Sequence, residues 1–207
     1  MMMQLYLSKL KYFWFELHQH YHFSEPQKIL NILIASYSEK QRAYHTVQHI
    51  YECLNLLESI RSELNDAHAV ALALWFHDVI YDPQAKHNEL KSAELFEQYM
   101  AQDLPVNTVE KIKRWILATQ KHALTDETDL QFLLDIDLAI LAATPERFVQ
   151  YEQQIQKEYA WVDPEVYSIK RKKVLVHFYQ SEPLYQTTYF QKNFELNAKQ
   201  NLKQILE

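Results

Sequence analysis

Glycine is absent from the 207-residue sequence, whereas ordinary usage of about 7 % would supply roughly 14. A Gly-rich phosphate loop and a dinucleotide-binding fingerprint are excluded, because both depend on glycine at fixed positions. Two-residue hairpin turns, which rely on Asn-Gly or Gly-Gly, are disfavoured as well. A chain of this length buries roughly 70 % of its unfolded surface. We therefore expect one domain over residues 1–207.

Positive charge is scarce: 21 Lys and Arg stand against 27 Asp and Glu, a formal net charge of −6. The densest basic run, residues 170–173, is too short to follow a phosphate backbone, so tight binding to duplex nucleic acid is disfavoured. A small anionic substrate fits this charge balance if a metal supplies the positive charge.

Cysteine and long apolar runs are also scarce. Cys53 is the single cysteine, which excludes an internal disulfide and a Cys-based zinc site. The first residues lack the apolar region and cleavage site of a signal peptide. No run approaches the roughly 20 apolar residues of a membrane span. We expect a cytoplasmic protein that has no membrane contact.

Apolar residues recur at helical spacing along nearly the whole chain, and no useful segment alternates with period two. The pattern predicts an all-α fold of nine or ten helices. Their expected ranges are 5–21, 24–37, 44–60, 67–80, 88–100, 105–121, 126–141, two that begin at 144 and 163, and 189 to the end. The fourth is apolar on almost all sides, which predicts a central, enclosed helix. Ser24 with Gln27 suggests a capping box for the second.

Two histidines, His45 and His49, are four residues apart in the third predicted helix. On a helix their side chains would share one face, with Cβ atoms about 5–6 Å apart. Such a pair can place two imidazoles at one metal, or one at the metal and one at its substrate. The alternative is an ordinary helix boundary where both histidines bond to neighbours.

Charged groups also lie inside apolar segments. His77-Asp78 ends the apolar fourth helix, and such groups are costly to bury without partners, which metal coordination would provide. Asp135 and Asp137 lie within the apolar segment 133–141. Because positions i and i+2 of a helix point about 200° apart, one site cannot use both equally. Asp137 lies on the more apolar face and is the better ligand candidate, whereas Asp135 would pair with a base or cap a neighbouring helix.

The order His49, then His77-Asp78, then Asp137 resembles the H…HD…D signature of the HD superfamily of metal-dependent phosphohydrolases. That superfamily is all-helical, so the resemblance implies an HD-domain-like bundle in which separate helices supply the ligands. Over roughly residues 5–207 the chain looks like one bacterial family of predicted HD phosphohydrolases, whose substrate is unsettled. The matching blocks are Tyr44-His45-x-x-x-His49-Ile50, Trp75-Phe76-His77-Asp78-Val79-Ile80-Tyr81-Asp82, Asn88-Glu89-x-x-Ser92-Ala93, Ala118-Thr119-x-x-His122 and Asp135-x-Asp137-Leu138-Ala139-Ile140-Leu141, with Glu158-Tyr159 and Arg171 nearer the end.

The resemblance implies the roles of the ligands and of the first histidine. The metal ligands would be His49, His77, Asp78 and Asp137. By analogy with cyclic-nucleotide phosphodiesterases, His45 would be the general acid that protonates the leaving oxygen.

Three further residues are candidates for the site. Asp82 matches half of the acidic pair that activates water in ppGpp hydrolases; Tyr81 replaces the other half, which puts a ppGpp activity in doubt. Glu89 is a candidate for proton handling, or it caps the fifth helix. His122 would bind a substrate phosphate or a second metal.

The sequence thus predicts a hydrolase for a phosphomonoester or phosphodiester of nucleotide size. One divalent transition metal is expected. Histidine and carboxylate ligands suit Mn, Fe, Co, Ni and Zn nearly equally, and the sequence is compatible with a second metal. Two alternatives stay open. A di-iron oxygenase would need both His87 and His122 as ligands, and a non-catalytic nucleotide- or metal-sensing module would bind without turnover. The oligomeric state is left open.

Overall fold

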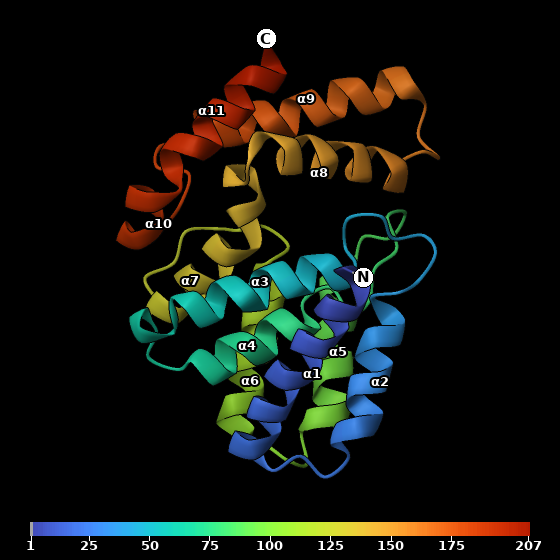
Figure 1. Ribbon diagram of the computed structural model, residues 1–207, viewed down its shortest axis with the longest axis vertical. Helices are drawn as coiled ribbons and strands as arrows, with labels where there is room; N and C mark the ends of the chain where they lie inside the picture. Colours follow the sequence, from blue (N-terminus) through green and yellow to red (C-terminus); the bar gives the residue numbers. More distant parts are fainter. Residues whose placement is uncertain (1) are drawn as a thin grey trace.

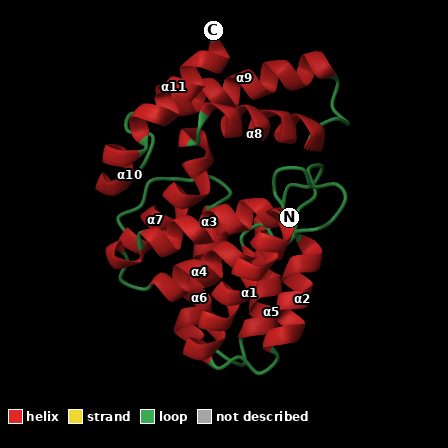
Figure 2. Ribbon diagram, in the orientation of Figure 1, coloured by secondary structure: helices red, strands yellow, loops and turns green. Residues whose placement is uncertain are grey.

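The computed structural model describes residues 2–207, and this part of the chain is all-α, without strands (Figure 2). The predicted fold class is therefore confirmed at this level. Eleven α-helices and two short 3-10 helices are present: α1 (Met2–Tyr21), α2 (Pro26–Ser36), α3 (Val47–Ser59), η1 (Arg61–Glu63), α4 (Ala67–Phe76), α5 (Asn88–Met100), α6 (Val106–Ala118), α7 (Thr128–Asp137), η2 (Leu138–Ala142), α8 (Pro145–Glu158), α9 (Pro164–Gln180), α10 (Thr188–Asn193) and α11 (Glu195–Leu206).

Helices α1 to α7 form a lower bundle, and α8 to α11 form a layer above it (Figure 1). Helix α4 is the centre of the bundle and packs against α1, α3, α5, α6 and α7. Nine of its ten residues are buried, as the apolar composition predicted for an enclosed helix. Asp66 caps its first turn by accepting a hydrogen bond from the N–H of Ala69.

The upper layer is tied to the bundle by buried polar contacts near η2. Asn201 of α11 donates to the carbonyl oxygens of Leu141 and Ala143. The Asp135 carboxylate accepts from the backbone N–H of Gln186 and from the N–H and hydroxyl of Thr187. Thr187 is the N-cap of α10, so Asp135 holds the start of a neighbouring helix, which was one of its two predicted roles.

Helix starts at Thr144-Pro145 and Asp163-Pro164 agree with the sequence prediction, and in both cases the cap side chain accepts from the first turn. The capping box predicted at Ser24 is not formed. Helix α2 begins at Pro26, and Ser24 donates instead to the carboxylate of Asp103.

Several helix boundaries also differ from the prediction. Helix α3 begins at Val47 rather than 44, and α4 ends at Phe76 rather than 80. The predicted seventh helix stops at Asp137 and continues as the tighter η2. The last predicted helix is divided at Phe194 into α10 and α11, so nine or ten helices was too low a count. Among residues 2–207, no helix has both the length and the apolar character needed to cross a membrane.

The first prediction concerns the central helix. Leu72 of α4 is fully buried, so Leu72→Ala should lower the free energy of unfolding by about 2–5 kcal/mol through lost burial and a residual cavity. Leu196→Ala on α11, where the leucine is 70 % exposed, is the matched control and should change it by about 0.5 kcal/mol or less. Urea denaturation measures both. Equal losses for the two variants would contradict the central position of α4.

Candidate metal centre

Four side chains predicted as ligands meet at one point inside the bundle. His49 lies on α3, His77 is the C-cap of α4 and Asp78 follows it, and Asp137 is the last residue of α7. Because α4 packs against both α3 and α7, the polar ends of these elements converge although they are far apart in sequence. His49 and His77 are each 1 % exposed, so the imidazoles are enclosed.

The spacing of the donor atoms matches what a small divalent ion requires. His49 Nε2 lies 3.2 Å from His77 Nε2, 3.3 Å from Asp137 Oδ1 and 3.7 Å from Asp78 Oδ2. His77 Nε2 lies 3.0 Å from Asp78 Oδ2 and 3.4 Å from Asp137 Oδ1. With ligand bonds of about 2.0–2.2 Å, neighbouring donors around one ion are about 3.0–3.6 Å apart in octahedral or tetrahedral geometry. The donor atoms of His49, His77 and Asp78 all lie within 4.8 Å of one another, so these three residues fit a metal, and Asp137 Oδ1 adjoins both imidazoles.

A hydrogen bond on the outer side of the ring orients the His77 imidazole. His77 Nδ1 lies 2.8 Å from the carbonyl oxygen of Leu74, which can only accept, so Nδ1 carries a proton and Nε2 is the nitrogen left for a ligand. Cys53 Sγ lies beside the His49 ring, 3.7 Å from Nδ1 and 3.9 Å from Nε2. Both Nε2 atoms thus face the carboxylates, as metal-binding histidines do.

The two carboxylates make this point attractive to positive charge. Burial raises the pKa of the Asp78 and Asp137 carboxyls, but the adjacent His77 imidazole outweighs it and both pKa values fall below the ordinary one. Burial likewise lowers the pKa of His77, yet the same carboxylates raise it well above its usual value. Two neutral imidazoles and two carboxylates suit Mn, Fe, Co, Ni or Zn.

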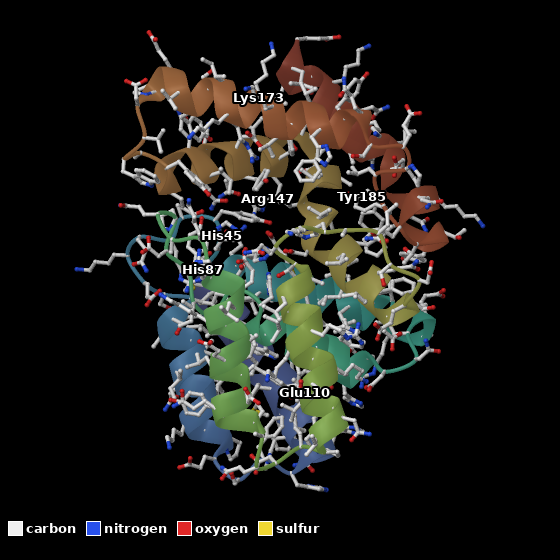
Figure 3. All side chains as sticks on the ribbon, turned by 180° about the vertical axis from the view of Figure 1, so that it is seen from behind. His45, His87, Glu110, Arg147, Lys173 and Tyr185 are labelled. Atoms are coloured by element: carbon white, nitrogen blue, oxygen red, sulfur yellow. The ribbon has the colours of Figure 1, made fainter. Side chains whose placement is uncertain are left out.

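His45 reaches the site from a loop, not from the face of α3. Helix α3 starts after the N-cap Thr46, so the expected four-residue helical spacing between His45 and His49 does not apply. The ring of His45 stacks on Tyr81 with centroids 4.1 Å apart and lies 5.9 Å from the His49 ring. In Figure 3 His45 lies where the lower bundle meets the upper layer.

Glu158 of α8, to which the sequence analysis assigned no role, holds the His45 loop. Its Oε1 accepts from the backbone N–H groups of Ala43, Tyr44 and His45, and its Oε2 lies 2.7 Å from His45 Nδ1. Tyr81 also donates its hydroxyl to Oε2. Glu158 could have been recognised from the sequence, because it continues the buried apolar face of α8, where a carboxylate needs partners.

Arg42 is a second residue near the ligands that the sequence motifs did not indicate. Its side chain is fully buried and donates to backbone carbonyls of His45, Asp78 and Val79. The guanidinium therefore joins the His45 loop to the turn that carries Asp78.

The remaining candidates differ in how near they lie to the ligands. His122, whose backbone φ is positive, places its Nε2 2.9 Å from Asp137 Oδ2. Asp82 is exposed and accepts from the N–H of Gln84 two residues on. Glu89 accepts from the side chain of Gln120. His87 is the exposed N-cap residue of α5. The contacts thus bring His122 to the ligand cluster, whereas those of Asp82 and Glu89 lie elsewhere.

Comparison of the chain with protein-family models, with curated proteins and with solved structures finds no match. The class of the protein therefore depends on the geometry of this site.

The second prediction concerns Glu158. Burial raises its pKa, but the hydrogen bond from His45 and the backbone N–H groups outweigh it and lower the pKa from 4.5 to about 2. A carboxyl group whose pKa is lower in the folded than in the unfolded chain stabilises the fold at pH values above the unfolded-state pKa. This stability is lost as the pH falls toward the folded-state pKa. At 1.36 kcal/mol per pKa unit, the contribution at pH 7 is on the order of 3 kcal/mol.

Metal-free wild type and Glu158→Gln should therefore differ strongly in unfolding free energy at pH 7, and more than half of the difference should disappear by about pH 3. Chemical denaturation at a series of pH values measures this. Glu146→Gln, at an exposed position in the first turn of the same helix, is the control and should follow wild type. A difference that stays constant from pH 7 to pH 3 would refute the role of the Glu158 charge.

Proposed function

We propose that this chain is a metal-dependent phosphohydrolase with an HD-domain-like bundle. The observation that carries the proposal is the convergence of His49, His77, Asp78 and Asp137, whose histidine nitrogens lie 3.0–3.7 Å from carboxylate oxygens of both aspartates. The chain order of these residues resembles the H…HD…D signature, and this geometry supports the resemblance.

The proposed substrate is a small phosphomonoester or phosphodiester. A divalent ion held by the four ligands would act as a Lewis acid toward a phosphoryl oxygen and lower the pKa of water. Asp78 and Asp137 have an exposed side-chain fraction of 15 % and 14 %, which leaves their oxygens accessible from one side. The Leu74 carbonyl occupies the Nδ1 side of His77, so this residue can offer only Nε2 to the cluster.

His45 is the proposed general acid. Glu158 faces Nδ1 at 2.7 Å, which leaves Nε2 as the atom that can give a proton to the leaving oxygen. Burial lowers the pKa of His45, but the Asp78 and Glu158 carboxylates outweigh it, so the pKa is raised, which favours the protonated ring that a general acid needs. Glu158 is a positioning residue, because it acts through His45.

Asp82 and Glu89 were alternative proton-handling residues. We assign the proton to His45 instead, since Asp82 accepts from a neighbouring backbone N–H and Glu89 from Gln120.

One observation favours a second ion. Asp137 directs Oδ1 toward the two ligand imidazoles and Oδ2 toward His122, so Oδ2 and His122 would be available to hold a further ion. The di-iron alternative also needs His87, whose backbone position at the start of α5 leaves its side chain exposed. Because His122 contacts the ligand cluster whereas His87 is exposed, we favour the hydrolase over a di-iron oxygenase.

The third prediction tests the ligand set. Purified wild type should hold about one divalent transition metal per chain, or about two if His122 shares a second ion, and Asp78→Ala should lose it. Asp82→Ala, four residues further on, is the matched control and should retain it. Elemental analysis measures the content. Full metal content in Asp78→Ala would overturn the proposed centre.

The fourth prediction tests His45. His45→Asn should lower kcat for an alkyl phosphate by about 10²–10⁴, the usual contribution of a general acid. The loss should be much smaller for p-nitrophenyl phosphate, whose leaving oxygen needs no proton, and metal content should be unchanged. Steady-state kinetics on both esters separate the cases. Equal losses on the two substrates would argue against proton donation by His45.

A further inference from the structure

A cavity of about 300 Å³ adjoins the metal centre on the side of α3 and η2. His49 and Asp137 belong to its wall, so it shares two of the four proposed ligands. Cys53 and Tyr44 line it beside His49, and Phe194, between α10 and α11, also contributes to its lining. Its volume is at the lower end of the range for small-molecule sites.

The lining away from the ligands is mostly apolar. Leu56 of α3, Ile136 of α7, and Ile140 and Ala142 of η2 contribute to it together with Phe194. Such walls bind hydrocarbon by removing it from water, and they offer a phosphate or a sugar few hydrogen-bond partners.

The one guanidinium in this lining, that of Arg147, is already neutralised. Its Nε and one Nη donate to the two oxygens of Glu52 at 2.8 Å, and its other Nη donates to Gln154 at 3.0 Å. The group also lies over the ring of Tyr44, 5.7 Å from its centroid. A bidentate carboxylate partner removes the charge that an anion would need, so this cavity does not suit a second phosphate.

We propose that this cavity takes the apolar group of the substrate, so that the chain acts on phosphate esters of apolar alcohols. This inference rests on the proposed function, because the phosphate of the substrate would lie at the metal centre, beside His49 and Asp137. The hydrocarbon of the same substrate would then pack against Leu56, Ile140 and Phe194. The alcohol released on hydrolysis is then an alkyl or aryl alcohol, not a nucleoside polyphosphate.

Non-hydrolysable phosphonates test the proposal by binding alone. Ethyl-, butyl- and hexylphosphonate are titrated into Zn-loaded wild type by calorimetry. Burial of each added methylene should tighten binding about fourfold until the cavity is full. Ala142→Phe, which fills the cavity from η2, should bind ethylphosphonate as wild type does and lose the gain with chain length. Ala101→Phe at an exposed position is the matched control and should keep it.

A second arm separates this inference from the proposed function. Hexanol is added to metal-free protein, and its binding is followed by ligand-observed NMR. Binding to wild type and not to Ala142→Phe supports the apolar site whether or not phosphonates bind. Metal-dependent binding of ethylphosphonate with no gain for longer chains and no hexanol binding overturns the apolar site and leaves the hydrolase proposal standing. The wild-type series is decisive even if Ala142→Phe does not fold.

Discussion

The pairing of two buried imidazoles with two carboxylates at the end of α4 is the interaction on which the rest of the site depends. Ionised carboxylates are expensive to bury unless positive charge and hydrogen bonds compensate them. The adjacent imidazoles lower the pKa of both Asp78 and Asp137, and the carboxylates in turn raise the pKa of His77. A point that demands positive charge this strongly is well suited to a divalent cation.

The bundle and the upper layer cooperate to hold this arrangement. Arg42 donates to carbonyls of the segments that carry His45 and Asp78, and Glu158 reaches from α8 to the His45 loop. On the other side of α7, Asp135 holds the start of α10. Two carboxylates two residues apart on one helix therefore serve opposite faces, one the ligand cluster and the other the junction of the layers.

Much of the fold followed from local chemistry. Apolar periodicity predicted the helical class, the all-round apolar character of α4 predicted its burial, and the cap-then-proline pairs predicted the starts of α8 and α9. The ligand cluster was predictable because histidine and aspartate inside apolar segments need partners. Its assignment as a metal centre stays a prediction.

The parts that sequence reasoning missed depend on contacts between distant residues. The start of α3 is displaced because N–H groups of residues 43–45 bind Glu158, which is 113–115 residues away in sequence. The role of Arg42 is visible only in the fold, because the Asp78 and Val79 carbonyls that it binds are 36 and 37 residues away in sequence. Asp82 occupies the expected motif position, yet its carboxylate accepts a hydrogen bond from the N–H of Gln84 in its own loop and does not contact the ligand cluster.

The central claim is that His49, His77, Asp78 and Asp137 surround one cation. The most direct measurement is anomalous diffraction at the manganese edge from crystals grown with Mn²⁺. The expected result is one strong peak about 2.0–2.3 Å from both Nε2 atoms and from an oxygen of each aspartate. A protein that takes up Mn²⁺ but shows its peak at other residues, or no peak among these four, would contradict the claim.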